Sequence, residues 1–364
     1  MNTSLSRKRF LQGSVAAVAA ALFTPRAALA NTAAASTGNR AMPLTQVWDK
    51  TFPKSAKVDH RKVTFKNRYG ITLAADLYVP KGVAGRKLPA LAVCGPFGAV
   101  KEQSSGLYAQ TMAERGFVAL AFDPSFTGES GGEPRHVASP DINTEDVSAA
   151  VDFLGLQPVV DRERIGVIGI CGWGGIALNA VAVDKRVKAV VASTMYDMSR
   201  VMSKGYNDSV TPAQRAQTLE QLGQQRWKDA KGGAPELLPM FNVLNGGEPQ
   251  FMVDYADYYK SKARGFHPRA INSNGSWTVT SALSFMNAPL MTYIAEISPR
   301  PILLIHGENA HSRYFSETAY AAAAQPKELM IIKGANHVDL YDRMDKIPFD
   351  AIADFFDKNL KAQA

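Results

Sequence analysis

Cysteine is scarce in this sequence, which contains only Cys94 and Cys171 among its 364 residues. Two cysteines exclude a disulfide-rich scaffold and any zinc site built from several thiolates. No HExxH or comparable cluster accompanies the six histidines, so His306 and His311 are interpreted as structural or pocket-lining residues. We therefore expect neither a metal ion nor a cofactor.

Long apolar runs and clusters of like charge are also missing from the body of the chain. No stretch of about 18 apolar residues occurs there, which argues against an integral membrane protein. Four of the charges in the formal net charge of +8 belong to Arg7, Lys8, Arg9 and Arg26 in the first 30 residues, which hold no acidic residue, and 8 minus 4 leaves +4 for the rest. This mild excess is spread without clusters and gives no reason to expect nucleic acid as a partner. With 46% hydrophobic and 20% charged residues, the composition is that of an ordinary globular protein.

The first 30 residues form the one exception to this pattern. A basic segment, Arg7 to Arg9, precedes an apolar run of small residues that ends at Ala28-Leu29-Ala30. This order predicts a signal peptide cut before Asn31, and hence a periplasmic or secreted protein without stable membrane insertion after cleavage. Ser-Arg-Lys-x-Phe-Leu also resembles a twin-arginine signal, which implies export in the folded state. The alternative is an amphipathic or disordered N-terminus without a targeting role.

Alternation of strands and helices indicates how the rest of the chain is organised. We expect an N-terminal extension over residues 31–57, an α/β core over 58–196 and 291–364, and a helical cap insertion over 197–290. Short apolar runs typical of buried strands cover residues 88–93, 117–122, 165–170, 187–194, 301–306 and 328–332. Helical spacing between them predicts βαβ units, and therefore a parallel sheet with right-handed crossovers.

The rest of the chain is arranged around the segment Gly169-Ile170-Cys171-Gly172-Trp173-Gly174-Gly175, which follows an apolar strand and opens a helix. A strand-to-helix turn that projects a nucleophile needs small residues on both sides of it. Cys171 is the only chemically sensible nucleophile in this turn. Trp173 departs from the pattern, since it stands two residues after the thiol where a small residue is expected, and we assign it to the substrate pocket.

A thiol nucleophile needs a base, and an acid that orients the base. His337 follows the last predicted strand in Gly-Ala-Asn-His and is the predicted base. For the acid we favour Glu308, after the 301–306 strand, because the usual aspartate position is occupied by Ala310. Asp197 is the second candidate, and it is also assigned to the pocket together with His311. Glu317 and Asp339 are further alternatives, as is the absence of any acid.

Two backbone N–H groups are expected to form an oxyanion hole. Gly172 supplies one, directly after the nucleophile and at a helix N-terminus, where the helix dipole is expected to lower the pKa of the thiol. Because Pro96 has no N–H, the second donor is Phe97 or Gly98.

Several of these motifs together carry a family resemblance, which extends over about residues 63–360. The elbow is similar to the Gly-x-Cys-x-Gly-Gly elbow of dienelactone hydrolases. With CGPFGAVKEQ, DPSFTGESGG, HGENAHSRYFSE and GANHVDLYD, the chain resembles the bacterial dienelactone hydrolase-like α/β-hydrolases that have a helical cap. The resemblance implies an α/β-hydrolase fold with a mostly parallel eight-stranded sheet flanked by helices. It also implies a Cys-His-acid triad, which supports Cys171 and His337 by position.

The sequence therefore predicts an exported hydrolase that forms an acyl-enzyme on Cys171 with a small-molecule ester, lactone or thioester. Two rival hypotheses stay open. Trp173 and Ala310 leave room for a non-catalytic binding or scaffold protein that has kept the fold. A Cys94–Cys171 disulfide is the other rival, because the strands that carry these residues are expected to be neighbours. The sequence makes no prediction about oligomeric state.

Overall fold

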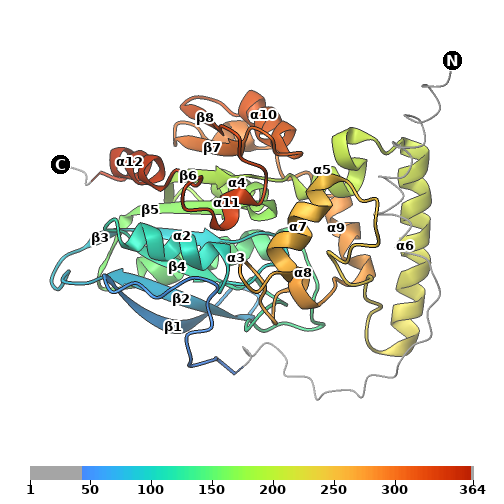
Figure 1. Ribbon diagram of the computed structural model, residues 1–364, viewed down its shortest axis with the longest axis horizontal. Coiled ribbons are helices and arrows are strands. Elements are labelled where there is room, and N and C mark those ends of the chain that lie inside the picture. The colour runs from blue at the N-terminus through green and yellow to red at the C-terminus, as the bar shows by residue number, and fades with distance from the viewer. Residues whose placement is uncertain (1–42, 362–364) are drawn as a thin grey trace.

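An eight-stranded sheet forms the centre of the protein in the computed structural model, which describes residues 43–361 (Figure 1). The predicted signal peptide and residues 31–42 of the predicted N-terminal extension lie outside these residues. The strand order is β1-β2-β4-β3-β5-β6-β7-β8. The strands are β1 (Val58–Lys66), β2 (Thr72–Pro80), β3 (Leu88–Cys94), β4 (Val118–Phe122), β5 (Val160–Ile170), β6 (Val187–Ser193), β7 (Ile302–Gly307) and β8 (Lys327–Ile332).

The first two strands form an antiparallel hairpin, and every later strand pairs in parallel with its neighbours, apart from the antiparallel β2–β4 contact. Strands β3, β4, β6 and β7 are buried along all or nearly all of their length, in keeping with their apolar sequences. Strand β5 is buried over its second half, which leads to Cys171. The mostly parallel α/β fold expected from the sequence is confirmed. Because parallel strands end at one edge of the sheet, the loops after β3, β5, β6, β7 and β8 converge there.

Helices cover both faces of the sheet. One face packs against α3 (Pro140–Gly155), α4 (Gly172–Val183) and α10 (Arg313–Ala322). The other packs against α2 (Ser104–Ala113), α12 (Phe349–Asn359) and the short α11 (Asp339–Asp342). Each face of the sheet has its own hydrophobic cluster. A side chain near the turn after β5 therefore packs into the cluster of one face or into that of the other.

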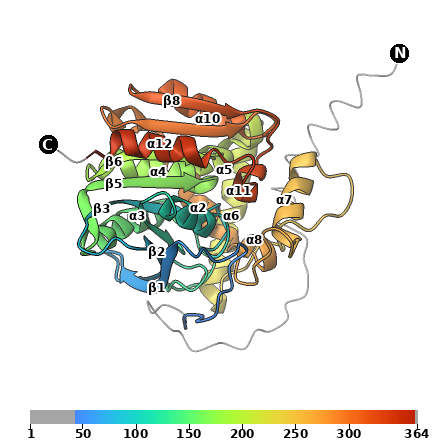
Figure 2. The same cartoon turned by 60° about the vertical axis from the view of Figure 1, so that its left-hand side comes forward.

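The segment between β6 and β7 contains no strand of the sheet and is mainly helical. Its helices are α5 (Met198–Lys204), α6 (Pro212–Gly232), α7 (Gln250–Lys260), α8 (Ile271–Asn274) and α9 (Ala282–Met286), with 3-10 turns at Tyr206–Asp208, Val279–Ser281 and Ile294–Ile297. Figures 1 and 2 show α6 and α7 standing beside the sheet rather than against either face. Residues 233–249 carry no helix, which differs from the helical character expected for the insertion.

From 43 to 361, no helix is both long and apolar enough to cross a membrane.

Candidate active site

Cys171 lies at the turn between β5 and α4, where the sequence predicts a nucleophile. Its backbone has φ 57° and ψ −128°, a conformation that non-glycine residues rarely adopt. Small neighbours are required by close packing, because a Cβ at Gly169 would lie 2.3 Å from the Trp173 carbonyl oxygen, and one at Gly175 would lie 2.4 Å from that of Tyr196. The turn therefore has the geometry of a nucleophile elbow.

Trp173 points away from this site. Its side chain is only 2% exposed and belongs to the cluster on the α3/α4 face, where it meets Phe122 edge-on at 5.8 Å between ring centroids. Cys171 belongs to the cluster on the opposite face. The assignment of Trp173 to the substrate pocket is therefore wrong. A large residue is tolerated two positions after the thiol because it enters the core beneath the turn.

The two cysteines are both free thiols in the structure. Cys94 is opposite Gly169 in the parallel register of β3 and β5, and its side chain belongs to the α3/α4 face. Because Cys171 belongs to the other face, the neighbouring strands do not bring the two sulfur atoms together. The structure thus gives no disulfide, contrary to the rival hypothesis.

Four donors surround the Cys171 sulfur. They are the hydroxyls of Tyr341 and Tyr255 and the backbone N–H groups of Gly172 and Phe97, and each lowers the thiol pKa because it can donate a hydrogen bond to the thiolate. Burial outweighs them and raises the pKa of Cys171 to about 11. The expectation that the helix N-terminus leaves a low-pKa thiol is therefore wrong, because the side chain is only 7% exposed.

The two N–H groups match the predicted oxyanion hole, with Phe97 rather than Gly98 as the second donor. Gly98 has φ 88°, and its carbonyl accepts a hydrogen bond from the N–H of Asn272 at 3.1 Å. The Asn272 side-chain amide donates to the Phe97 carbonyl at 2.7 Å. Asn272 comes from α8, so the segment between β6 and β7 holds the oxyanion loop in place.

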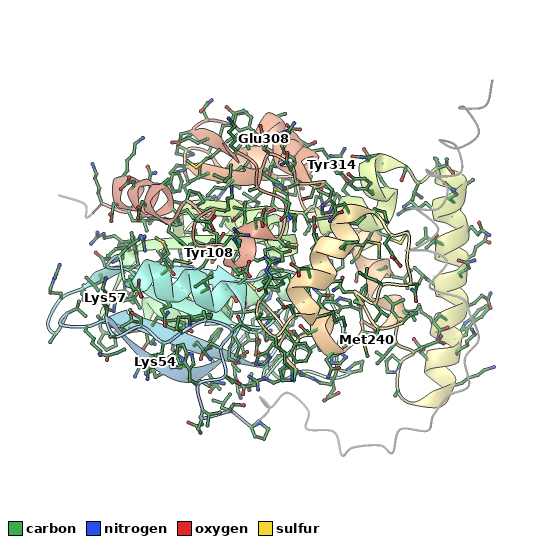
Figure 3. All side chains as sticks on the ribbon, viewed as in Figure 1. Lys54, Lys57, Tyr108, Met240, Glu308 and Tyr314 are labelled. Carbon is green, nitrogen blue, oxygen red and sulfur yellow. The ribbon has the colours of Figure 1, made fainter. Side chains whose placement is uncertain are left out.

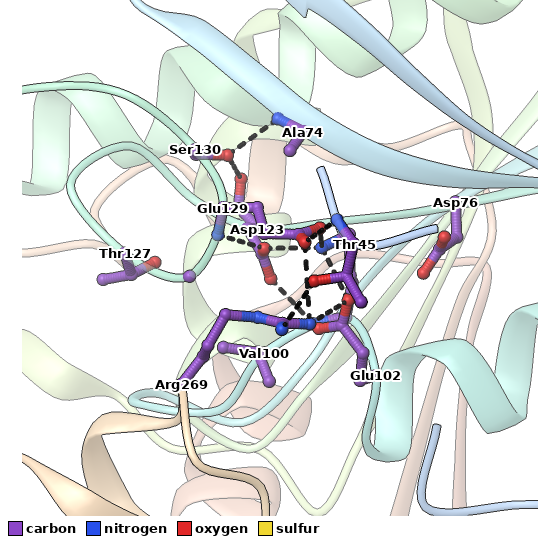
Figure 4. A network of polar contacts seen from close by, with 12 residues as sticks. Thr45, Ala74, Asp76, Val100, Glu102, Asp123, Thr127, Glu129, Ser130 and Arg269 are labelled. Carbon is purple, nitrogen blue, oxygen red and sulfur yellow. Dashed lines mark hydrogen bonds and ion pairs between the residues drawn. The ribbon is translucent and has the colours of Figure 1, made fainter. Parts of the chain in front are cut away.

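A buried ionic network holds the far end of the same loop (Figure 4). The Lys101 ammonium lies 2.9 Å from Asp123 and 2.6 Å from Glu129, and its backbone N–H donates to Asp123 at 2.8 Å. Arg269 lies 2.9 Å from Glu102. These charges are buried in compensating pairs, which is the condition under which buried ions are tolerated.

His337 is the predicted base, and it lies on the loop after β8, buried at 2% exposure. Its Nε2 is 2.9 Å from the Tyr341 hydroxyl, which in turn hydrogen-bonds to Cys171. The hydroxyl therefore stands between the histidine and the thiol. Burial and the neighbouring histidines His311 and His306 hold the pKa of His337 well below its usual value, so the ring is neutral at rest.

Neither acid predicted from the sequence reaches His337. Glu308, labelled in Figure 3, is exposed, and its carboxylate accepts a hydrogen bond from the Gly334 N–H at 2.8 Å. Asp197 caps helix α5, where it accepts from the Arg200 N–H at 3.0 Å. These contacts correct both assignments to the triad, whereas the assignment of Asp197 to the pocket stays a prediction.

The further alternatives are engaged elsewhere too. Glu317 pairs with Arg313 at 2.9 Å, and Asp339 accepts from the Asn336 N–H at 2.8 Å.

Hydroxyl groups take the place of an acid beside the histidine. The Nδ1 atom of His337 is 2.6 Å from the Ser312 Oγ and 2.9 Å from the Thr194 Oγ1. The sequence analysis did not identify either residue, nor did it identify Tyr341. Two of these residues lie close in sequence to residues already assigned to the site, since Tyr341 is four residues after His337 and Ser312 directly follows His311. This closeness is a weak sequence signal for a role in the site.

Aromatic rings from α7 and from the loops after β6 and β7 complete the surroundings. His311 stacks on Phe251 with 4.3 Å between ring centroids, hydrogen-bonds to the Tyr196 hydroxyl, and lies 5.3 Å from His337. Tyr255 lies 5.3 Å from His337 between ring centroids. Among residues 43–361, no three His, Cys, Asp or Glu side chains are arranged to hold a metal ion.

Comparison with known proteins places this site in a family. A model of the X-Pro dipeptidyl-peptidases (S15 family) matches residues 69–243, a segment that includes Cys171 but not His337. The uncharacterized protein PA2218 of Pseudomonas aeruginosa is 72% identical over 362 residues, 99% of this chain and 97% of that protein. The uncharacterized protein YcjY of Escherichia coli is 32% identical over 307 residues, covering 83% of this chain and 99% of YcjY. The chain belongs to the family of PA2218 and YcjY.

Solved structures agree with this assignment and extend it to the fold. The crystal structure of PA2218 superposes with a TM-score of 0.86 at 76% identity, over 87% of this chain and 99% of that one. The α/β hydrolase GrgF from Penicillium superposes with a TM-score of 0.70 at 23% identity, over 83% and 99% of the two chains. GrgF is described as a polyketide transferase. Its sequence is 26% identical to this chain over 279 residues, which cover 76% of this chain and 89% of GrgF. This chain has the α/β-hydrolase fold and is similar to hydrolytic enzymes.

Proposed function

We propose that this α/β hydrolase cleaves an ester, lactone or thioester through an acyl-enzyme on Cys171. The observation that carries the proposal is the surroundings of the sulfur, where the N–H groups of Gly172 and Phe97 lie beside a thiol held on a turn with positive φ. Such N–H pairs stabilise the negative charge that develops on a carbonyl oxygen during acyl transfer. The resemblance of the elbow to that of dienelactone hydrolases supports a small carboxylic ester or lactone.

The first half of the reaction follows from these positions. The thiol proton passes to the Tyr341 oxygen while the Tyr341 hydroxyl proton passes to Nε2 of His337. The sulfur then forms a bond to the substrate carbonyl carbon, and the resulting oxyanion is bound by the two N–H groups. Collapse of this intermediate breaks the bond to the leaving alcohol or thiol, which takes the proton from His337.

In the second half, His337 accepts a proton from water as the water attacks the thioester carbon. The carbon–sulfur bond breaks, the acid is released, and the thiol recovers its proton along the same path. An acyl-enzyme can also pass its acyl group to a hydroxyl or amine other than water. The description of GrgF as a polyketide transferase makes this transfer the second candidate activity, and the burial of Cys171 favours it because water has restricted access.

The decisive experiment compares Cys171→Ala with Cys94→Ala, which removes the other buried thiol from the opposite face of the sheet. With p-nitrophenyl acetate or butyrate, we expect Cys171→Ala to lose at least about 10³-fold in kcat/KM, because the nucleophile is gone. Cys94→Ala should keep its activity. Intact-mass spectrometry should show an acyl adduct only when Cys171 is present.

Undiminished turnover by Cys171→Ala would overturn the mechanism. Absence of turnover and of any adduct in the wild type, over a panel of esters, lactones, thioesters and Xaa-Pro amides, would favour the rival hypothesis of a non-catalytic protein that has kept the fold. Product ratios measured with added alcohol separate transfer from hydrolysis.

Location in the cell belongs to the same proposal. The basic, apolar and Ala-x-Ala segments of residues 1–30 support export to the periplasm or beyond, with cleavage before Asn31. Edman sequencing or mass analysis of the protein from a periplasmic extract tests this, and a mature chain that still begins at Met1 would contradict it.

A further inference from the structure

The group that orients His337 is not a carboxylate. A base histidine needs a partner on Nδ1 that keeps a hydrogen there and leaves the Nε2 lone pair facing the nucleophile. Here the partners of Nδ1 are the Ser312 and Thr194 oxygens, at 2.6 and 2.9 Å. No carboxylate forms a hydrogen bond or ion pair with His337 among the described residues.

Behind Ser312 lies a second imidazole. The Ser312 Oγ is 2.9 Å from Nε2 of His306, and Nδ1 of His306 is 2.6 Å from the Ser316 Oγ. All four side chains of the chain His337–Ser312–His306–Ser316 are buried. Water therefore does not compete for these hydrogen bonds, and each group depends on its protein partner.

Chemistry fixes the direction of the hydrogen bonds along this chain. Nε2 of His337 has to be free to accept a proton, so its Nδ1–H donates to Ser312. Ser312 in turn donates its hydroxyl hydrogen to Nε2 of His306, which places the hydrogen of His306 on Nδ1, where it donates to Ser316.

The threonine beside the histidine agrees with this direction. The Thr194 hydroxyl donates to the His337 carbonyl at 3.3 Å, so its oxygen is left to accept from the same Nδ1–H. Burial holds the pKa of His306 at about 3, which keeps that ring neutral and able to accept.

We propose that Ser312 and His306 are positioning residues for the catalytic base, forming a neutral hydroxyl–imidazole relay where a triad would have an acid. This inference rests on the proposed function of Cys171 and His337. The relay sets the tautomer and orientation of His337 without supplying a negative charge. The imidazolium formed during turnover is consequently stabilised by hydrogen-bond dipoles alone.

Two variants of Ser312 separate positioning from simple packing. Ser312→Ala removes the acceptor, and we expect kcat to fall roughly 10- to 100-fold, part of what a positioned base contributes, with KM little changed. Ser312→Asp places a carboxylate beside Nδ1–H, and we expect it to raise the pKa of His337, moving the acid limb of the kcat/KM profile to higher pH and speeding iodoacetamide alkylation of Cys171 at pH 7. Ser104→Ala is the matched control, because the buried Ser104 hydroxyl has no hydrogen-bond partner.

A measurement on the unmodified protein keeps the inference testable if a variant does not fold. In ¹⁵N-histidine-labelled wild type, with His337→Gln used to assign the signal, we expect His337 to carry its hydrogen on Nδ1 and to stay neutral at pH 7. An Nε2–H tautomer, or wild-type kcat and an unchanged pH profile in both Ser312 variants, would overturn the relay.

These readouts distinguish failure of the relay from failure of the proposed function. If Cys171→Ala abolishes turnover while the Ser312 variants behave as wild type, the relay alone is wrong. If no Cys171-dependent turnover occurs, the proposed function fails, and the tautomer and the alkylation rate still decide whether Ser312 and His306 position the ring.

Discussion

At the scale of single residues, the tyrosine between the base and the thiol distinguishes this site from a direct histidine–cysteine pair. The Tyr341 hydroxyl contacts Nε2 of His337 at 2.9 Å and also hydrogen-bonds to Cys171. Burial raises the pKa of Tyr341 well above its usual value, so the hydroxyl keeps its proton at neutral pH. It can therefore donate one proton while it accepts another.

Replacing this hydroxyl should be costly for turnover. We expect Tyr341→Phe to lower kcat with p-nitrophenyl esters by roughly 10- to 100-fold, because the proton path from Cys171 to His337 is interrupted. The matched control is Tyr78→Phe, which removes a buried hydroxyl that has no hydrogen-bond partner. Wild-type kcat in Tyr341→Phe, at an unchanged melting temperature, would show that His337 reaches the thiol without this residue.

The pKa of the thiol gives a second test at this scale. Because burial raises the pKa of Cys171 to about 11, the thiolate fraction should grow about tenfold per pH unit up to that value. The rate of iodoacetamide alkylation, followed by mass spectrometry from pH 7 to 10, should rise accordingly. A plateau near pH 8.5 would indicate an ordinary thiol instead.

The placing of Cys171 at the strand-to-helix turn and of His337 near it was predictable from the sequence, whereas the group that contacts Nδ1 of His337 was not. Glycines that bracket one thiol after an apolar strand identify Cys171, and the loop after the last strand offers only one histidine. An orienting group leaves no such pattern, because acids and hydroxyls occur on every loop at this edge. Which of them meets Nδ1 depends on loop geometry, which placed Glu308 in solvent and Ser312 against the ring.

Among the structural elements, the loop between β3 and α2 has the strictest requirements. It carries the Phe97 N–H to the sulfur and is held by Asn272 at one end and by the Lys101 network at the other. A Cβ on Gly98 would lie 2.5 Å from the Asn272 side chain. The loop therefore has no room for a side chain at this position.

Gly98→Ala should separate activity from stability. Its Cβ would displace Asn272 and with it the Phe97 N–H, so we expect kcat to fall about 10²-fold or more, the loss typical of an oxyanion donor. Gly116→Ala is the control, since Gly116 also has a positive φ, of 99°, but nothing lies within 4 Å of its Cβ position. Both variants should lose about 1 kcal/mol of stability from the backbone conformation, and only Gly98→Ala should lose activity. Equal activity in the two would show that the loop tolerates the displacement.

The strands were predicted closely because each is a short apolar run that ends in polar residues or glycine. The insertion between β6 and β7 was harder to predict, because its helices stand beside the sheet and need only partial burial. Trp227 illustrates this, since this large aromatic side chain of the insertion is 65% exposed. Tyr255 belongs to the same insertion but faces His337.

For the whole molecule, the buried histidines link stability to pH. Burial holds the pKa values of His306 and His311 at about 3 and that of His337 well below its usual value. Because these pKa values are lowered in the folded state, the unfolded chain binds more protons than the folded protein. The free energy of unfolding therefore decreases as pH falls below about 6.5. Asp146 acts in the opposite sense below about pH 6, because burial raises its pKa to about 6.

We expect the free energy of unfolding, measured with urea, to fall between pH 6.5 and 5. The pKa values of Asp123 and Asp357 are raised as well, and those of His136 and His267 are lowered. Each histidine contributes up to about 1.4 kcal/mol per pH unit, so the five histidines outweigh the three carboxyls. His311→Gln should reduce the slope by about one proton. A free energy that stays constant down to pH 5 would contradict the assignment of neutral, buried rings.

The burial of Cys171 also has a consequence for oxidation. Peroxides react with the thiolate and hardly with the neutral thiol, and they need access to the sulfur. The raised pKa of Cys171 keeps the thiolate fraction small, and its 7% exposure restricts access to the sulfur. Because Cys94 lies on the opposite face of the sheet, no second thiol is at hand to convert a sulfenic acid into a disulfide. The same burial that keeps the nucleophile unreactive at rest therefore protects it from oxidative inactivation, so the protein should keep its activity during prolonged storage in air without added reductant.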